Sequence, residues 1–363
     1  MMAGDRFFAA DIERFAAAAF MALGVPERDA QIVAGLMVEA DLTGYDTHGT
    51  FRLRQYLNRL RDGGTNARAH ITVVNDHGAT ALVDGDNGLG HLAMRFAARL
   101  AIKKAEEFGI GWVGVRNSNH AGPASLYVRM PVKRDMIGLY GAVGSANHVP
   151  PFGGSEKLLG TNPIAVAVPA GSAPPFILDM ATTVASVGRI KTLAQRGEPM
   201  PEGWMIGRDG KPLTDPARRE EGFLLPIGGA KGYGLAMALG LLAGTLNGAA
   251  FGRNVADFTN DTVTASNTGQ FIAAISLSAF GDPAAFKADV DAAFRDIGES
   301  EPLPGFERVR IPGDRREEIY KDRVANGIPL HRNLLKVFSE IAAELGIGDP
   351  VRSEIQPRAE MPA

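Results

Sequence analysis

Between two helical patterns near the N-terminus lies the stretch Asp41-Leu-Thr-Gly-Tyr-Asp-Thr-His-Gly-Thr-Phe-Arg52. Gly44 ends the first helix and apolar helical spacing resumes after Thr50, so the stretch forms a corner of a helical layer. It places His48 four residues before Arg52. Imidazole moves protons near neutral pH, and guanidinium binds a carboxylate through two parallel hydrogen bonds. The pair indicates a site for a small organic acid; the alternative is a polar helix start.

Apolar periodicity predicts helices over 11–23, 26–43 and 50–61, which form the helical layer. The period then changes, and the apolar runs 71–74 and 79–83 predict a hairpin. Because strands and helices alternate from here on, the sequence predicts a mixed α/β fold. Further strands are expected at 112–115, 136–143, 164–168, 175–179, 271–277 and 306–311. Further helices are expected at 90–108, 184–196, 231–248, 283–297, 315–326 and 331–345.

The composition is that of an ordinary globular protein, with 45% hydrophobic and 22% charged residues among 363. The formal net charge is −3 and no basic stripe is present, so neither nucleic acid nor a membrane is an expected partner. Cysteine is absent, which excludes disulfides and thiol catalysis and fits a reducing, cytoplasmic location. The run 15–25 is too short to span a bilayer and lacks the features of a signal peptide.

The most apolar run of the chain is Gly232–Phe251, in which glycine and alanine dominate. We interpret it as a buried helix of a large core rather than as a membrane span. Glycines at 240, 244 and 248 form one face, which lets a sheet or a neighbouring helix approach closely.

A glycine pattern, Gly88-x-Gly90-x-x-Ala93, has the spacing of a dinucleotide-binding fingerprint. The strand that follows it ends in Val115-Arg-Asn117, without the acid that would bind a ribose hydroxyl. The preceding strand is more simply the second half of the hairpin. A conventional Rossmann site is therefore disfavoured here.

Directly after the strand at 112–115 comes the polar loop Arg116-Asn-Ser-Asn-His-Ala-Gly122. Binding sites lie at such strand exits in α/β proteins. His120 is thus a second candidate acid or base beside His48. The alternative is a loop histidine satisfied by neighbouring Asn or Ser side chains.

Three other segments place small or polar residues at strand ends, at 144–148, 159–163 and 178–183. Asp179 would either orient a histidine or cap the following helix. Lys231 begins an apolar helix, where the helix dipole disfavours a cation, so contact with a phosphate or ribose is a reason for its presence. No histidine pair has metal-ligand spacing, so no metal site is expected.

These motifs together resemble the malate/L-lactate dehydrogenase type 2 family of NAD(P)-dependent oxidoreductases. The family also includes ureidoglycolate and sulfolactate dehydrogenases and Δ1-piperideine-2-carboxylate reductases. The resemblance runs from about 11 to 346 as one family unit. Its landmarks are 41–52, 117–122, 159–169, 178–191, 203–216, 225–251 and 311–327.

The family's Ser-His-Gly appears here as Thr47-His-Gly49, and its Ser-Asn-His is intact at Ser118-Asn-His120. The resemblance implies that His120 gives or takes the proton and that Arg52 binds the substrate carboxylate. Which of His48 and His120 is the donor stays open, with His120 favoured. Asp179 would support whichever imidazolium forms.

The resemblance also implies a substrate pocket that includes Thr47 and His148. Many members have no histidine at position 148, which leaves the substrate open. The family usually has Pro-Gly-Glu where this chain has Pro-Gly-Asp, so the last residue is one methylene shorter. The implied cofactor contacts are Ser145, Asp179, Met180, Ala181, Lys231, Pro312, Gly313 and Asp314.

The family fold binds NAD or NADP on a largely antiparallel, non-Rossmann sheet between helical layers, and its members form homodimers. On this basis we expect an N-terminal helical layer over 1–68, joined by the C-terminal helices in 315–348. Residues 69–314 would form the α/β region that binds cofactor and substrate. The polar segment 349–363 is expected to be a loose tail.

Three functions are then open. The first is hydride transfer between a nicotinamide cofactor and a small 2-hydroxy or 2-oxo acid such as malate, lactate or sulfolactate. The second is reduction of a cyclic imino acid on the same scaffold. The third is a non-catalytic nucleotide-binding protein, against which the retention of two acid/base histidines argues.

Overall fold

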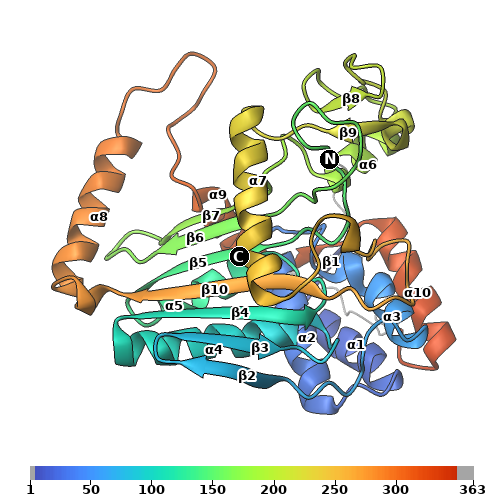
Figure 1. The fold of residues 1–363 in the computed structure, drawn as a ribbon, viewed down its shortest axis with the longest axis horizontal. Coiled ribbons are helices and arrows are strands. Elements are labelled where there is room, and N and C mark those ends of the chain that lie inside the picture. The colour runs from blue at the N-terminus through green and yellow to red at the C-terminus, as the bar shows by residue number, and fades with distance from the viewer. Residues whose placement is uncertain (1–4, 350–363) are drawn as a thin grey trace, which may run out of the picture.

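A seven-stranded sheet runs through the middle of the computed structural model, which describes residues 5–349 (Figure 1). Every neighbouring pair of its strands is antiparallel except β3 with β4. The predicted mixed α/β fold with a largely antiparallel sheet is therefore confirmed. Apart from Asp349, the expected tail lies outside the described residues. In sheet order the strands are β2 (Thr72–His77), β3 (Thr80–Asp84), β4 (Ile110–Ser118), β10 (Thr268–Ser276), β5 (Met136–Ala142), β6 (Ile164–Val168) and β7 (Phe176–Met180).

The parallel strands β3 and β4 are joined by α4 (Gly90–Phe108), which packs on one face of the sheet. The buried face of α4 is mostly alanine, so the helix lies close to the strands. It ends as predicted before Gly109, whose φ of 80° is the left-handed conformation that glycine adopts without strain. A Cβ on Gly90 would overlap the carbonyl oxygen of Asn119, so glycine here permits contact between the helix start and the loop after β4.

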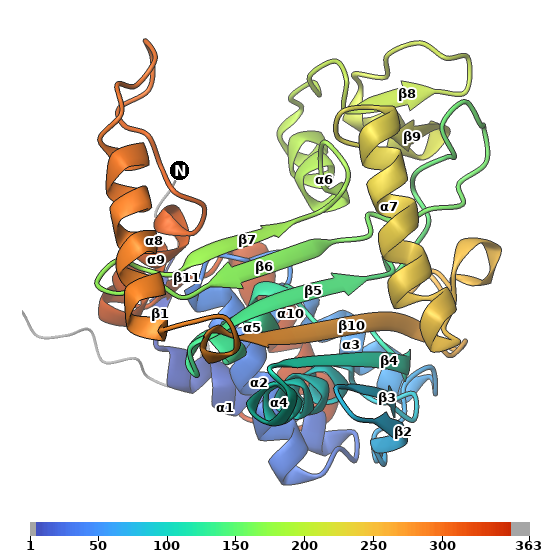
Figure 2. The same cartoon turned by 60° about the vertical axis from the view of Figure 1, so that its left-hand side comes forward.

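The predicted helical layer covers the same side of the molecule as α4 (Figures 1 and 2). Its apolar stripes meet in one core, where the rings of Phe15 and Phe338 are 5.1 Å apart. The first and last described segments also pair, since β1 (Arg6–Phe7) is antiparallel to β11 (Ile328–Pro329). The helices of the layer are α1 (Ala9–Ala22), α2 (Glu27–Leu42), α3 (Leu53–Arg61) after the 3-10 turn η1 (Thr50–Arg52), and α10 (Arg332–Leu345).

One helix of this side, α5 (Ser125–Val132), was not predicted from the sequence. It packs on β5 and β6 and contains Pro131 in its last turn. A proline and a short apolar run hide a helix from a periodicity argument.

The opposite face of the sheet carries α7 (Ala230–Ala243) and, beside it, a small unit with its own apolar core. We call it the β8–β9 unit. Its core includes Ile190, Met205 and Leu224. Its elements are α6 (Val187–Arg196), β8 (Met205–Gly207), η2 (Pro216–Glu221) and β9 (Gly222–Leu224). Three more 3-10 turns are η3 (Thr245–Asn247), η4 (Gly252–Asn254) and η5 (Leu277–Ala279).

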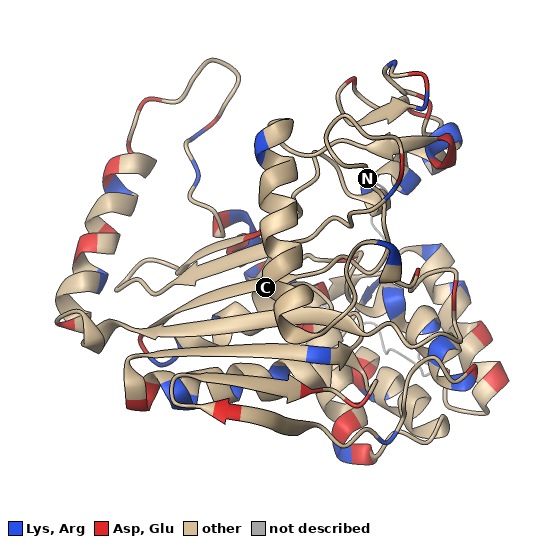
Figure 3. Ribbon diagram, in the orientation of Figure 1, with Lys and Arg blue, Asp and Glu red and all other residues tan. Residues whose placement is uncertain are grey.

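The prediction that the apolar run at 232–251 is wholly buried is wrong. Only one face of α7 packs on the sheet, while Leu241, Leu242 and Leu246 are 46%, 39% and 65% exposed. Charge is absent from α7 beyond its first turn, as Figure 3 shows. At Gly240 a Cβ would overlap the ring of Phe251, so the close neighbour there is a loop side chain rather than the expected sheet or helix.

The prediction of a strand at 306–311 is also wrong, because this segment pairs with no strand in the described chain. It follows α8 (Pro283–Gly298), and both stand away from the sheet in Figure 2. Its charged side chains pair with α9 (Asp314–Asn326) instead, as in the ion pair between Arg310 and Glu318 at 3.0 Å. Within residues 5–349, no helix is both long enough and apolar enough to cross a membrane.

Candidate active site

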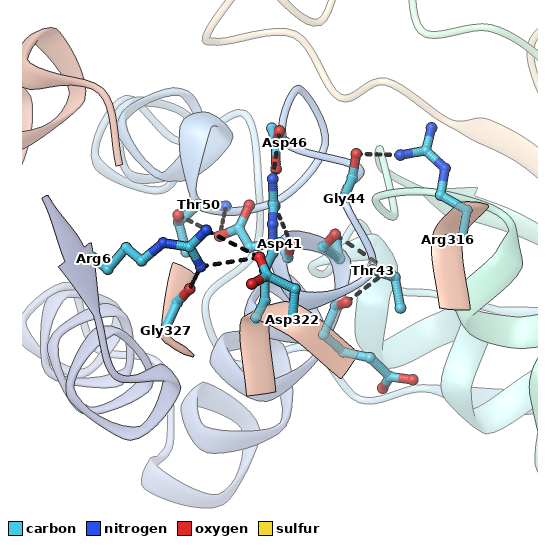
Figure 4. Close-up of polar contacts among 12 residues, drawn as sticks. Arg6, Asp41, Thr43, Gly44, Asp46, Thr50, Arg316, Asp322 and Gly327 are labelled. Atoms are coloured by element: carbon cyan, nitrogen blue, oxygen red, sulfur yellow. Dashed lines mark hydrogen bonds and ion pairs between the residues drawn. The ribbon is translucent and has the colours of Figure 1, made fainter. Parts of the chain in front are cut away.

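The corner between α2 and η1 is shaped by a buried carboxylate. Oδ2 of Asp41 accepts hydrogen bonds from the backbone N–H of Thr50, at 3.0 Å, and from its hydroxyl, at 2.5 Å (Figure 4). A Cβ on Gly49 would overlap the other carboxylate oxygen, so only glycine fits this turn. Burial raises the pKa of Asp41 to about 7, and the two hydrogen bonds from Thr50 oppose that rise. The corner presents the side chains of His48 and Arg52.

The loop after β4 is held by neutral amides. The side-chain amide of Asn119 donates to the carbonyl oxygens of Asn87, at 3.1 Å, and Gly88, at 2.8 Å. The backbone carbonyl oxygen of Asn119 accepts from Nε2 of Gln270 on β10, at 3.1 Å. These bonds fix the position of His120, the next residue along the chain.

The two candidate histidines meet face to face. The rings of His48 and His120 are stacked, with centroids 5.6 Å apart and an interplanar angle of 22°. Nδ1 of His48 is 2.9 Å from the hydroxyl of Thr47. The structure therefore brings together three residues predicted from sequence, on two segments about seventy positions apart.

Tyr56 on α3 is a contact of His120 that the sequence analysis missed. Its hydroxyl oxygen is 2.5 Å from Nδ1 of His120, and the backbone N–H of Gly122 points at the same nitrogen from 3.3 Å. Burial raises the pKa of Tyr56, so the phenol stays protonated and donates. Two donors on Nδ1 assign the proton of neutral His120 to Nε2. The only sequence signal was spacing, because Tyr56 lies one helical turn after Arg52.

A third histidine, His91 at the start of α4, packs edge-on against the ring of Tyr56 at 5.3 Å. It is fully buried, and neither ring nitrogen has a hydrogen-bond partner among the described residues. Burial lowers the pKa of His91 to about 3.

The two paired histidines are also neutral at physiological pH. Burial, followed by the charges of Arg52 and Arg316, lowers the pKa of His48 to about 4. Burial and the neighbouring Arg52 lower the pKa of His120 well below its usual value. An anion bound beside them would oppose both effects and raise both pKa values.

The guanidinium of Arg52 is held in position by two hydrogen bonds but forms no ion pair within the described residues. Its Nε donates to the carbonyl oxygen of Thr47 at 2.9 Å, and Nη1 donates to Oε1 of Gln55 at 2.8 Å. No carboxylate of residues 5–349 forms an ion pair with it. Its remaining donors can therefore bind a carboxylate in the two-pronged manner that guanidinium favours.

Phe258 connects the three parts of the site. Its ring packs on that of His120, with centroids 5.6 Å apart. Its carbonyl oxygen accepts from Nε2 of Gln55 at 3.3 Å, and its N–H donates to the carbonyl oxygen of Ser145 at 2.9 Å. Ser145, an expected cofactor contact, is thus linked to His120 through Phe258, and to Arg52 through Phe258 and Gln55.

Asp179 lies at the end of β7 and is partly buried, yet it makes no hydrogen bond to either histidine within the described chain. Its Oδ2 accepts from the backbone N–H of Ser125 at 2.8 Å, at the start of α5. Burial raises the pKa of Asp179, while the hydrogen bonds from Ser125 and the charge of Arg316 oppose that rise. Asp179 therefore contacts the start of α5 and does not cap the following helix, α6, whose N-cap is Ser186. Support of an imidazolium stays a prediction.

Most other expected cofactor contacts gather along β7. Met180 ends that strand and Ala181 follows it. Pro312 lies against the same strand, because its carbonyl oxygen accepts from the N–H of Ile177 at 2.9 Å. Asp314 begins α9, and its Oδ2 accepts from the N–H of Ile311 at 2.9 Å.

Gly313 and Lys231 complete the expected cofactor set. Gly313 has a φ of 112°, a conformation that favours glycine. Lys231 is exposed in the first turn of α7 and follows Gly228 and Gly229, which both have positive φ.

His148 is the expected residue that lies apart from the others. Its ring lines a small cavity of the β8–β9 unit together with Lys157, Arg219 and Glu220. Burial lowers its pKa. In the described residues no hydrogen bond or ring contact joins it to His48 or His120, so a role in the substrate pocket stays a prediction.

Two neutral imidazoles lie beside the guanidinium of Arg52, which forms no ion pair within residues 5–349. Such an arrangement is typical of an enzyme that binds a small acid and moves a proton. The chain belongs to the malate/L-lactate dehydrogenase family, whose sequence profile matches residues 7–339. It is 42% identical over 324 residues to the L-sulfolactate dehydrogenase of Methanocaldococcus jannaschii, which covers 89% of this chain and 92% of that protein. The structure of the sulfolactate dehydrogenase from that organism superposes with a TM-score of 0.90 at 38% identity, over 96% of this chain and 100% of that one.

Two further relatives differ in the cofactor that their names give. The ureidoglycolate dehydrogenase (NAD(+)) of Escherichia coli K12 is 32% identical over 307 residues, which is 85% of this chain and 87% of that protein. The (2R)-3-sulfolactate dehydrogenase (NADP(+)) of Chromohalobacter salexigens is 32% identical over 316 residues, 86% of this chain and 91% of that protein. The predicted family is confirmed, and with it an NAD(P)-dependent oxidoreductase.

Proposed function

We propose that this protein transfers a hydride between NAD or NADP and C2 of a small 2-hydroxy or 2-oxo acid. The observation that carries the proposal is the stacked pair of His48 and His120 beside the unpaired guanidinium of Arg52. The reaction needs an anchor for the carboxylate and a proton for the oxygen at C2, and these residues meet both needs.

In the reductive direction Arg52 holds the carboxylate of the oxo acid and so fixes the carbonyl relative to the histidines. Negative charge then develops on the carbonyl oxygen, and His120 supplies a proton to it. Tyr56 and Gly122 keep the Nδ1 side of that ring occupied, so Nε2 is the nitrogen that faces the reaction. The bound anion raises the pKa of His120 from its depressed value, which couples proton uptake to substrate binding. His48 is the second candidate for the same step.

The residues along β7 and α7 suit a dinucleotide. Lys231 has no carboxylate partner within residues 5–349, and a Cβ on Gly228 would meet no atom closer than 4.0 Å, so an anionic group can approach the start of α7. We assign Lys231 to phosphate or ribose, and Ser145, Asp179–Ala181 and Pro312–Asp314 to the rest of the cofactor. When bound, the nicotinamide supplies or accepts the hydride. The cofactor would then lie on an antiparallel sheet, unlike in a Rossmann fold.

Further proposals concern the protein as a whole. We propose a homodimer, supported by the exposed leucines of α7, since an uncharged apolar helix face is typical of a subunit interface. We place the protein in the cytoplasm on its lack of cysteine. We keep the division into a helical layer over 1–68 with 315–348 and an α/β region over 69–314.

A panel of substrates tests the function. Oxidation of NADH and of NADPH would be followed with pyruvate, oxaloacetate, sulfopyruvate and Δ1-pyrroline-2-carboxylate, using His120→Ala as the matched inactive control. We expect turnover of at least one oxo acid by the native protein and its loss in the variant. Turnover of the cyclic imine alone would favour the reductase, and cofactor binding without any turnover would favour a non-catalytic nucleotide-binding protein.

A further inference from the structure

A second arginine, Arg316 on α9, faces the corner that carries His48. Its Nη1 donates to the carbonyl oxygen of Gly44, as Figure 4 shows, and its Cζ lies 4.1 Å above the ring centroid of Tyr45. The carbonyl oxygen of Tyr45 in turn accepts from the N–H of His48 at 2.7 Å. The guanidinium is therefore packed on the same turn that presents the histidine.

The space that Arg316 occupies is fitted to it. Gly44 has a φ of 78°, and a Cβ on it would lie 2.9 Å from Nη1 of Arg316. The face of an aromatic ring attracts a cation and holds its plane. Arg316 is thus an oriented group rather than a free surface side chain.

The charge of Arg316 has no counterion within the described part of the chain. Among residues 5–349, no carboxylate forms an ion pair with Arg316 or with Arg52. Arg323, two turns further along α9, differs because it forms an ion pair with Asp46. The charge of Arg316 lowers the pKa of Asp179, but Oδ2 of that carboxylate accepts a hydrogen bond from the backbone N–H of Ser125.

Two cations that form no ion pair within residues 5–349 therefore act on one partly buried histidine. Both Arg52 and Arg316 lower the pKa of His48. One carboxylate on Arg52 would neutralise only half of this charge. A partly buried cation without a partner is unfavourable, so the working complex is expected to bring a second negative group.

We propose that Arg316 binds a second anionic group of the reacting complex, in addition to the carboxylate that Arg52 holds. This proposal rests on the proposed function. The group is an oxyanion such as a carboxylate, sulfonate or phosphate, which matches the planar guanidinium. It comes either from the far end of the substrate or from the diphosphate of the cofactor. The first source makes the substrate a 2-hydroxy acid with a second acidic group, rather than lactate.

Equilibrium binding tests the proposal without requiring turnover. Calorimetry would compare native protein, Arg316→Gln and Arg315→Gln, in which Arg315 is the exposed neighbour on α9. ADP-ribose is titrated into the free protein. L-malate, 3-sulfolactate and L-lactate are titrated into protein saturated with reduced cofactor, a combination that cannot react.

We expect Arg316→Gln to weaken the binding of malate and of sulfolactate by on the order of 10- to 100-fold. This is the range for losing a hydrogen bond to a charged group. Lactate and ADP-ribose should bind as in native protein, and Arg315→Gln should change nothing. Weaker ADP-ribose binding, with the three acids affected alike, would assign the anion to the cofactor. Unchanged binding of all four ligands would overturn the proposal, as would a native protein that binds none of them. Native binding without turnover of any substrate would instead refute the proposed function alone.

Discussion

The corner at 41–52 and the loop after β4 deliver one histidine each to the same place, but they are held by different forces. The corner depends on ionisable groups, namely the buried carboxylate of Asp41 and the guanidinium groups of α9. The loop depends on neutral amides, those of Asn119 and Gln270. Because a carboxylate titrates and a guanidinium attracts anions, we expect the corner to respond to pH and to bound anions, whereas neutral amides do neither. We therefore call the corner the responsive side of the site and the loop that carries His120 its rigid side.

The largest effect is expected at the rigid side. His120→Ala should lower kcat by several hundredfold or more, because general acid/base catalysis is worth roughly 10²–10⁴-fold. Cofactor affinity should stay close to the native value. Stopped-flow turnover with cofactor titration measures both quantities, and His48→Ala is the matched variant. A larger loss of turnover in His48→Ala than in His120→Ala would identify His48 as the proton donor.

The next effect is expected at the responsive side. Arg52→Lys should raise KM for the acid by on the order of tenfold or more, because lysine keeps the charge but cannot offer two parallel donors. The value of kcat should change less. Steady-state kinetics with varied acid separates the two constants, and an unchanged KM would mean that another residue holds the carboxylate.

A smaller effect is expected where the two regions touch. Tyr56→Phe removes one donor from Nδ1 of His120, and a neutral hydrogen bond contributes about 0.5–1.5 kcal/mol. Turnover should therefore fall about 2- to 10-fold. Because the lost bond favoured the neutral ring, the pKa of His120 should rise, which an NMR titration of its ring protons would detect. An unchanged pKa of His120 in this variant would contradict the assigned tautomer, even if KM rises.

The last effect concerns stability rather than rate. The pKa of Asp41 is raised to about 7 in the folded protein from an ordinary value near 3.8. The folded state then binds more protons than the unfolded state between these values, so this group makes the free energy of unfolding decrease as pH rises through that window. Asp41→Asn should remove that decrease. Gln270→Leu, on the amide-held side, should lower stability equally at every pH; urea unfolding at several pH values would measure the contrast.

Much of the fold and part of the site could be predicted because their signals are local. The helix 90–108 and its terminal Gly109 follow from periodicity and backbone freedom, and the motifs at His48, Arg52 and His120 lie on short segments. From the sequence, Tyr56 is recognisable only as one of the apolar residues on the buried side of its helix. Its hydroxyl contact depends on how α3 lies against the loop after β4.

The errors have physical causes of the same kind. An all-apolar helix such as α7 has no polar face to reveal which side stays exposed, so its leucines looked like core. The segment 306–311 has suitable residues for a strand, but strand formation needs a free sheet edge, which no local pattern encodes. Arg316 lies far from His48 in sequence, and only the docking of α9 brings them together.

The pairing of β1 with β11, and of α1 with α10, has a consequence for synthesis. The core that includes Phe15 and Phe338 can close only after Phe338 has been synthesised. The layer that carries His48 and Arg52 therefore stays incomplete while the sheet and its amide-held loop are already made. Contacts so distant along the chain form slowly and leave apolar helices open to aggregation in the meantime. We therefore expect the acid-binding residues to reach their working arrangement after the strands of the sheet have been synthesised.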